Sequence, residues 1–398
     1  MLRSQPPNTW REVFLVFLRL GLTSFGGPVA HLAYFRNEFV ERRRWLDESA
    51  YADLVALCQF LPGPTSSQAG IALGLMRAGP AGAFAAFAGF TAPSAIAMIL
   101  FGYGVVLLPG IASSAGLHGL KIVAVAIVAQ AVLLMARTLA PDVPRAIVAV
   151  LAAVVAIAIP SALGQIAVIV MGGLAGALFL TGTARKADGF DFPLSPAIAA
   201  PSLTLFVLLL IVLPLAANLS GDRTLAVIDG FYRAGALVFG GGHLVLPLLQ
   251  SATVPQGWVA NSDFLAGYGA AQALPGPLFT FAAYLGTVMT SAPNGWTGGL
   301  IALFAIFLPS FLLVFGIVPI WNRWRSFRGA QSVLSGINAA VVGLLAAALY
   351  DPVFTGAIFT VADFALAAAI FLLLTVGRSP SWLAVILGAG VAALLGLG

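Results

Sequence analysis

The chain has 398 residues, of which 60% are hydrophobic and only 8% are charged. Because an ordinary soluble domain carries about 25% charged residues, this composition argues against a soluble enzyme, a nucleic-acid-binding protein and a disordered chain. It predicts an all-α, polytopic helical membrane protein. The single cysteine, Cys58, leaves no intrachain disulfide, and three dispersed histidines make a metal site unexpected.

Nine apolar runs are long enough to cross a hydrocarbon core of roughly 30 Å at about 1.5 Å per residue. They are residues 80–107, 117–139, 144–160, 163–182, 202–219, 295–320, 331–350, 355–376 and 381–398. Four further apolar segments contain Gly-Gly or Pro-Gly-Pro, at residues 11–30, 50–76, 225–246 and 263–290. Since proline lacks a backbone donor and glycine frees the backbone, each is expected to form two half-helices or a re-entrant hairpin.

The two halves of the sequence resemble each other. The segment from Arg19 to Gly27 matches the segment from Arg233 to Gly241 at an offset of 214, and Gln59 to Pro64 matches Gln272 to Pro277 at an offset of 213. A looser match relates 90–94 to 307–310. We therefore predict two homologous repeats, at residues 1–182 and 203–398, joined by a polar linker at 183–202.

Charge and helix count predict that the second repeat is inverted. Five predicted helices separate the broken segments of the two repeats, and an odd number of crossings reverses the direction of the chain. The segment from Arg19 to Arg77 contains six arginines, both ends included, whereas the segment from Arg233 to Trp321 contains only Arg233 itself. By the positive-inside rule, the loops of the first repeat face the cytoplasm and those of the second face outward. Paired broken helices in inverted-topology repeats are typical of secondary transporters, with the site at the repeat interface.

Two arginines occupy equivalent positions in the repeats. Arg19 and Arg233 each lie about nine residues, or ~13 Å, into an apolar segment. An unpaired, dry arginine at such a depth costs at least about 2.5–3.5 kcal/mol. Their repetition suggests an anion site, but a structural role is an equal alternative. Asp229, four residues before Arg233, could neutralise it on the same helix face.

The glycine breaks are the next candidates. Gly26, Gly27, Gly240 and Gly241 leave backbone amides uncovered, and half-helix N-termini suit an anion without placing a full charge in the membrane. Close helix packing is the alternative. His31 and His243 follow these glycines and could donate to an anion or titrate, although a buried histidine more often has only a structural hydrogen bond.

A polar, uncharged stretch surrounds the first Pro-Gly-Pro. Its candidate ligands for an oxyanion are Gln59, Gly63, Thr65, Ser66, Ser67 and Gln68. A helix that begins after Pro64 would present three hydroxyls and free amides in its first turn, and plain N-capping is the alternative. The second repeat keeps Gln272 and Gly276 but loses two of the three hydroxyls, so we expect the first repeat to make more contacts.

Three acidic residues in or near apolar segments are candidate proton-coupling sites: Asp53, Asp229 and Asp363. Capping or an interfacial position is the alternative for Asp53. No zinc-protease motif, phosphate-binding loop or Ser/His/Asp set is present. The sequence therefore predicts no enzyme activity, no cofactor and no bound metal.

Together these motifs resemble the chromate ion transporter family in its long, two-domain form. The resemblance rests on Phe25 to His31, Trp45-Leu46 and Gln59 to Gln68 in the first half, and on 239–243 and 272–277 in the second. It implies a multi-pass protein of the cell inner (plasma) membrane, with inverted halves, that exports chromate and confers chromate resistance.

Two alternatives to chromate export remain at this point. The first is uptake or exchange of sulfate, a tetrahedral dianion of similar shape, or of another small anion on the same scaffold. The second is a passive channel or an intramembrane enzyme. The expected partners are a small inorganic anion and the lipid bilayer, not nucleic acid, and the sequence leaves a homo-oligomer open.

Overall fold

The computed structural model describes residues 9–108, 115–180, 196–239, 242–321 and 328–397. Within these ranges all regular secondary structure is helical, which confirms the predicted all-α class. Five of the described helices are long and apolar enough to cross a membrane: Thr65–Leu107, Ala115–Leu139, Ala199–Ser220, Gly295–Ile320 and Gln331–Phe354. The chain is thus a polytopic helical membrane protein.

The first half contains α1 (Trp10–Thr23), α2 (Gly27–Arg36), the π-helix η1 (Asn37–Arg42), α3 (Glu48–Phe60), α4 (Thr65–Leu107), α6 (Ala115–Leu139), α7 (Val143–Ala158) and α8 (Ala162–Phe179). The second begins with η2 (Pro196–Ile198), α9 (Ala199–Ser220), α10 (Arg223–Ala236), η3 (Gly242–Leu244), α11 (Val245–Thr253) and α12 (Asn261–Ala271). It ends with η4 (Leu278–Thr280), α13 (Phe281–Val288), α14 (Gly295–Ile317), η5 (Val318–Ile320), α16 (Arg328–Ala348), η6 (Leu349–Phe354), α17 (Val361–Thr375) and α18 (Ser381–Leu395). The predicted linker at 183–202 lies mostly outside the described residues.

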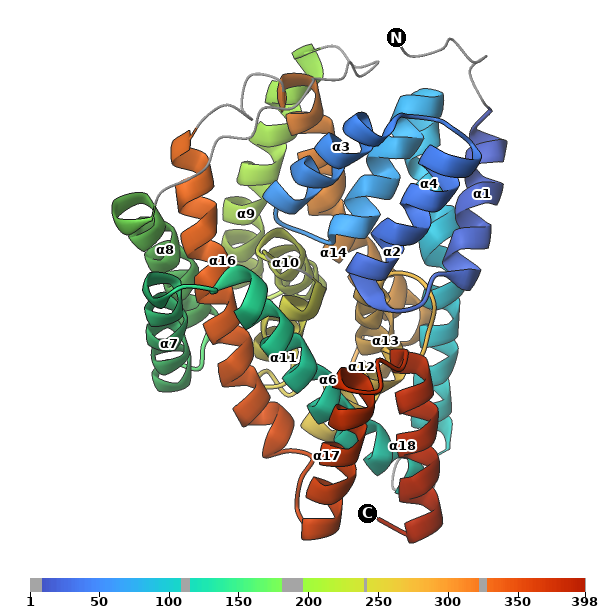
Figure 1. Ribbon diagram of the computed structural model, residues 1–398, viewed down its shortest axis with the longest axis vertical. Coiled ribbons are helices and arrows are strands. Elements are labelled where there is room, and N and C mark those ends of the chain that lie inside the picture. The colour runs from blue at the N-terminus through green and yellow to red at the C-terminus, as the bar shows by residue number, and fades with distance from the viewer. Residues whose placement is uncertain (1–8, 109–114, 181–195, 240–241, 322–327, 398) are drawn as a thin grey trace.

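Both predicted broken segments of the first half are broken helices that turn back on themselves (Figure 1). In the first, Arg43, which follows the returning helix, pairs with Glu12 at the start of α1 at 3.2 Å. The second contains α3 and the first part of α4, which is kinked at Ala78 and Gly79. There, the Arg77 guanidinium lies 4.8 Å from the ring centroid of Trp45, so the two ends of this hairpin meet as well.

The two broken segments of the second half have the same form. Arg223 at the start of α10 lies 5.8 Å from the ring centroid of Trp258, which follows α11. The N–H of Thr290, just after α13, donates to the Trp258 carbonyl at 3.0 Å, and the Tyr284 hydroxyl donates to the Asp263 carbonyl near the start of α12 at 2.9 Å. All four segments are therefore hairpins of half-helices rather than kinked single helices.

Four of the nine apolar runs do not form full-length crossings. The helices within them have 16 residues in α7, 18 in α8 and 15 each in α17 and α18, and Thr360 caps α17 well inside the run 355–376. At 1.5 Å per residue, 15 residues span only about 22 Å, less than the hydrocarbon core. The predicted runs 144–160, 163–182, 355–376 and 381–398 thus form helices shorter than the five candidate spans. Each lies in a short hairpin, α7–α8 or α17–α18 (Figure 1).

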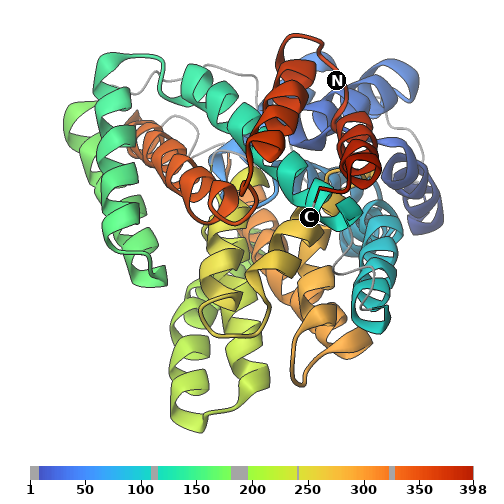
Figure 2. The same cartoon turned by 90° about the horizontal axis from the view of Figure 1, so that it is seen from below.

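The two halves interlock through their long helices. The long helix of the second half, α16, packs against α7 and α8 of the first, while α6 of the first half packs against α17 and α18 of the second. Figure 2 shows these two groups on either side of the crossing between α6 and α16. As a result, each short hairpin is covered by a helix of the opposite half.

Glycine permits the closest helix contacts within each half. A Cβ at Gly21 of α1 would lie 2.7 Å from the Phe90 carbonyl oxygen of α4, and a Cβ at Gly235 of α10 would overlap the Ile306 carbonyl of α14. Small residues of this kind let membrane helices approach backbone to backbone. This packing fixes α1 and α10, and therefore the breaks at their C-terminal ends.

Candidate anion site at the helix breaks

The four helix breaks meet in the interior, held by two cross-connections between the halves. The N–H of Gly63 in the second break donates to the Val238 carbonyl in the third at 2.6 Å. The N–H of Gly276 in the fourth break donates to the Ser24 carbonyl in the first at 2.9 Å. These bonds relate positions that the repeat alignment had paired, because Gly63 aligns with Gly276 and Ser24 aligns with Val238.

Both Pro-Gly-Pro glycines are required by conformation and by space. Gly63 has φ +122°, and a Cβ there would lie 2.5 Å from Gln68 Nε2 and 3.0 Å from Ser310 Oγ. Gly276 has φ +95°, and a Cβ there would lie 2.9 Å from Ser94 Oγ. Each glycine therefore brings the backbone of one half against a serine on a long helix of the other half.

His31 joins the first two breaks. It is 1% exposed, its Nε2 lies 3.1 Å from the Ser24 carbonyl oxygen, and its Nδ1 lies 3.2 Å from Ser66 Oγ. A carbonyl can only accept, so Nε2 carries a proton, and in the neutral ring Nδ1 accepts from the Ser66 hydroxyl. His31 thus fixes the orientation of the Ser66 hydroxyl in the first turn of α4.

Several polar atoms around these breaks are buried without a hydrogen-bond partner among the described residues. They are Ser24 Oγ, Ser67 Oγ, Gln68 Oε1, Thr91 Oγ1, Gln272 Nε2 and Ser310 Oγ. Leaving such a group unsatisfied costs about 1–3 kcal/mol. A concentration of them at one place marks a site where a polar ligand or water makes the missing bonds.

We call the central set the cradle: Ser24, His31, Gly63, Ser66, Ser67, Gln68, Gly276 and Ser310. The half-helices α2 and α4 begin beside it, and neither is capped by a side chain. Thr65, Ser66 and Ser67 are buried and do not cap α4, so the capping alternative does not apply to them. Free amides at a helix N-terminus and neutral hydroxyls can hold an oxyanion without a full positive charge.

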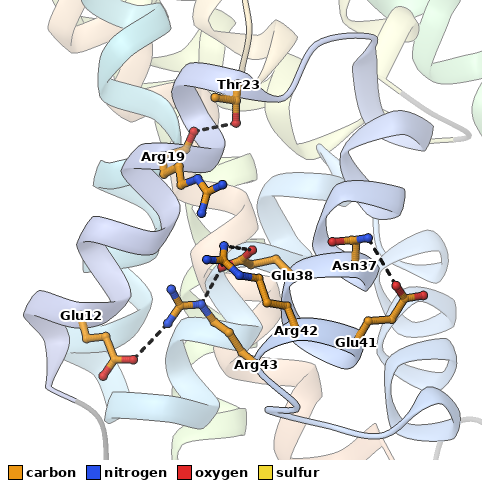
Figure 3. Close-up of polar contacts among 8 residues, drawn as sticks. All are labelled: Glu12, Arg19, Thr23, Asn37, Glu38, Glu41, Arg42 and Arg43. Atoms are coloured by element: carbon orange, nitrogen blue, oxygen red, sulfur yellow. Dashed lines mark hydrogen bonds and ion pairs between the residues drawn. The ribbon is translucent and has the colours of Figure 1, made fainter.

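Other predicted site residues lie outside the cradle. The Gln59 side chain is exposed, and Arg19 is exposed on α1 with its backbone carbonyl bonded to the Thr23 hydroxyl at 2.8 Å. In Figure 3 the Arg19 side chain extends from α1 toward the ion pairs around Glu38. Gly240 and Gly241, like the side chain of His243, fall outside the described residues.

The predicted acidic residues have different surroundings. Asp229 pairs with Arg233 at 2.5 Å in a separate cavity beside α10. Asp363 lies 3.1 Å from His118 Nε2 and also accepts from the Phe359 and Thr360 amides at the start of α17, which favours a structural role. Asp53 is 4% exposed on α3.

The arginine-rich segment after α2 forms an ion-pair network, not a patch of free positive charge (Figure 3). Glu38 accepts from Arg43 at 2.6 Å and from Arg42 at 3.1 Å, and Arg43 also reaches Glu12. Burial alone would raise the pKa of Glu38, but the hydrogen bonds from Arg43 and Arg42 outweigh it and lower that pKa. The network thus connects the start of α1 to the residues that follow η1, at the other end of the same hairpin.

The sequence predictions missed the serines that the long helices contribute. Ser94 and Ser310 lie in the middle of α4 and α14, one repeat apart, and each contacts the opposite Pro-Gly-Pro glycine. The loose repeat match between 90–94 and 307–310 was the available signal. This match was informative because a serine at equivalent positions of two apolar helices indicates a polar contact at both positions.

Comparison with known proteins identifies relatives along most of the chain. The family model described as chromate transporter matches residues 11–177 and 225–394. The chromate transport protein of Pseudomonas aeruginosa is 28% identical over 354 residues, covering 87% of this chain and 82% of that protein. The chromate transport protein of Cupriavidus metallidurans is 25% identical, covering 86% and 82%.

A shorter relative, the uncharacterized transporter YwrA of Bacillus subtilis, is 35% identical over 118 residues, or 29% of this chain and 62% of its own length. No solved structure matches the chain.

Proposed function

The chain belongs to the chromate transporter family, and from this premise we propose that it is a secondary transporter that carries chromate out of the cytoplasm through the cradle and thereby confers chromate resistance. The observation that carries the proposal is the meeting of four helix breaks around buried hydroxyls that lack partners among the described residues. The chromate dianion is a tetrahedral oxyanion that only accepts hydrogen bonds, so it suits a set of donors.

A neutral cradle suits transport better than a permanently charged one. An anion held by amide and hydroxyl dipoles is released at little cost, whereas a fixed guanidinium in a dry interior would bind it more strongly. None of the cradle residues carries a full charge when His31 is neutral. The first half supplies Thr65, Ser66 and Ser67 where the second supplies Leu278, Phe279 and Thr280, which supports the prediction that the first half makes more ligand contacts.

Two inverted repeats would give this cradle alternating access to the two sides of the membrane. The reciprocal bonds Gly63 to Val238 and Gly276 to Ser24 support such a relation, as do the matched hairpins and the two separate matches to one family model. On this interpretation α4, α6 and α9 cross between the first hairpin of each half. That odd number still inverts the second half, although fewer helices cross than the sequence predicted.

The direction follows from charge. The six arginines from Arg19 to Arg77 support a cytoplasmic position for the hairpin loops of the first repeat under the positive-inside rule, in the cell inner membrane. An inside-negative potential favours anion exit by about 2.3 kcal/mol per charge per 100 mV, so about 4.6 kcal/mol for a dianion. Export of chromate therefore needs no nucleotide-driven subunit.

The test is chromate flux in proteoliposomes that contain the purified chain, at a set membrane potential. We expect saturable efflux that an inside-negative potential accelerates and that Ser67→Ala weakens several-fold in apparent affinity, because the Ser67 hydroxyl has no partner among the described residues and can donate to a bound anion. Ser262→Ala, at an exposed position on α12, is the matched control and should behave as wild type.

Cells that produce the wild-type chain should accumulate less chromate than cells without it. Higher accumulation would refute export. Sulfate flux with no chromate flux would mean that the cradle carries a different oxyanion.

A further inference from the structure

A polar cavity lies between α8, α9, α10 and α11. Its volume is about 220 Å³, and its walls include Gln165, Asn218, Ser251 and Trp258 as well as the ion pair of Asp229 and Arg233. This space exceeds what one water needs by more than tenfold and has room for a small hydrated anion. We call it the α10 cavity.

The ion pair in this cavity is incomplete. Asp229 is 5% exposed, and its Oδ2 meets Arg233 Nη2 at 2.5 Å. Its other oxygen, Oδ1, has no partner among the described residues, and neither has Arg233 Nε. Arginine binds oxyanions best through two parallel bonds, and Nε and Nη2 form one such edge. Asp229 occupies only Nη2 of that edge and leaves Nε without a partner among the described residues, whereas a ligand with two oxygens could bind both atoms.

The surroundings contain few other charges. The described parts of α9, α11 and α14, which pack against α10, contain no acidic or basic residue, and neither does α8. Arg223 lies against the ring of Trp258, which lines the cavity, and its Nε and Nη2 are buried without a described partner. The lining of the cavity therefore holds one guanidinium and one carboxylate, and Arg223, with the N-cap residue Asp222 next to it in the chain, lies against Trp258 outside that lining.

The α10 cavity adjoins the cradle. Leu237 lines the cavity, and the next residue, Val238, accepts the hydrogen bond from Gly63 of the cradle. Consecutive residues of the third break therefore belong to the cavity wall and to the cradle. The equivalent position in the first half differs, since position 15, which aligns with Asp229, is an exposed leucine.

We propose that the α10 cavity is a second oxyanion site, in which the Asp229 carboxylate occupies the place of the anion on Arg233 and gives it up on taking up a proton. The exchange is balanced: the carboxylate gains one proton from cavity water and becomes a neutral acid, the Asp229–Arg233 ion pair opens, and the oxyanion binds Nε and Nη2 of Arg233. No covalent bond changes. The chemical class of the ligand is a tetrahedral oxyanion, and its identity as chromate rests on the proposed function.

The proton is needed because a bound dianion and an ionised Asp229 would share one guanidinium. Two like charges on one guanidinium repel each other at close range. Protonation of Asp229 removes this repulsion, so anion binding takes up one proton. Linkage then makes the affinity rise with falling pH by up to about tenfold per pH unit. At neutral pH, the tethered carboxylate holds the site against anions returning from that side of the membrane.

The experiment titrates the purified full-length chain with inorganic sulfate by calorimetry between about pH 5 and pH 8. Sulfate keeps its charge over this range, whereas chromate protonates. We expect wild-type affinity to rise as the pH falls. Asp229→Asn should bind about tenfold more tightly at neutral pH and lose the pH dependence, while Arg233→Gln should lose this site. Asp263→Asn, a half-buried acid on α12 that forms no ion pair among the described residues, is the control and should keep the wild-type profile.

Trp258 supplies a local readout that separates the cavity from the cradle. Chromate absorbs in the near ultraviolet and quenches nearby tryptophan emission. We expect Trp258→Phe to remove a quenching component that Arg233→Gln also removes. Thermal unfolding of each variant verifies folding. An unchanged pH slope in Asp229→Asn, or unchanged sulfate binding in a folded Arg233→Gln, would overturn the inference. An absence of chromate flux in the wild-type chain would refute the proposed function instead, and the sulfate titration would still decide the cavity.

Discussion

The cross-connections at Gly63 and Gly276 make the cradle sensitive to a single methyl group. Alanine at either position must adopt a positive φ, and its Cβ would meet a neighbour at 2.5 Å in one case and 2.9 Å in the other. At Gly63 the neighbours are the Gln68 amide and Ser310 Oγ, and at Gly276 the nearest is Ser94 Oγ. Alanine at Gly63 therefore displaces the Gln68 amide and crowds Ser310, and alanine at Gly276 displaces Ser94, so both substitutions disturb the cradle.

The expected cost has two parts. A left-handed backbone costs a non-glycine residue about 1–2 kcal/mol. Displacing well-packed neighbours costs a further 1–3 kcal/mol or so. The sum is about 2–5 kcal/mol. Even its lower limit exceeds the roughly 1.4 kcal/mol that corresponds to a tenfold change in an equilibrium constant. We therefore expect Gly63→Ala and Gly276→Ala each to reduce chromate flux at least tenfold.

Gly221→Ala is the matched control for the backbone part of this cost. Gly221 ends α9 with φ +65°, and nothing lies within 4 Å of a Cβ built there. It should lose a little thermal stability and keep its flux. Flux in proteoliposomes and thermal unfolding in detergent are measured for all three variants. If Gly63→Ala and Gly276→Ala fold and transport as well as Gly221→Ala, the close approach of the breaks has no role in transport and the reasoning fails.

Two further predictions concern stability. The pKa of Glu38 is lowered from its usual 4.5 despite burial, because Arg43 and Arg42 donate hydrogen bonds to it. Its contribution to folding stability is therefore complete above about pH 4.5 and is lost as the pH falls through the lowered pKa of the folded state. The melting temperature of wild type should therefore exceed that of Glu38→Gln near neutral pH and converge with it in acid; a constant difference would contradict the ion-pair assignment. The pair His118 and Asp363 connects α6 to α17 at 3.1 Å, so a double-mutant cycle of His118→Ala and Asp363→Asn in thermal unfolding should give a coupling of about 0.5–3 kcal/mol. A coupling near zero would mean that Asp363 acts only as a cap.

The helix breaks could be predicted from the sequence because their causes are local. Gly26 has φ +98° and Gly63 has φ +122°, backbone conformations that other residues rarely adopt. The lengths of the short hairpins could not be predicted in the same way. An apolar run measures hydrophobicity, but the helix within it need not fill the run: Thr360 caps α17 well inside the run 355–376, and α8 ends at Phe179 before the run 163–182 does.

The composition of the site was predicted only in part. The residues within a break, such as Ser66 and His31, follow from the local motif. Their partners across the molecule do not, because Ser310 and Val238 are brought to the cradle by the packing of the two halves. Equivalent positions also proved unequal. Arg19 is exposed, whereas Arg233 lies in a cavity with Asp229, and nothing in the repeat alone distinguishes these environments.

This inequality bears on how two similar halves can move an anion in one direction. On the inverted-repeat interpretation, the backbone contacts at Gly63 and Gly276 are interchangeable, so inward-facing and outward-facing states have similar energy and either is accessible. The side chains break that balance. One half brings hydroxyls to the cradle, and the other places a carboxylate on the arginine beside the exit. An anion from the first half meets neutral donors, while an anion from the second must displace Asp229 and bring a proton with it. The side-chain asymmetry thus makes the two routes to the cradle chemically different, while the membrane potential, on the proposed function, sets the net direction.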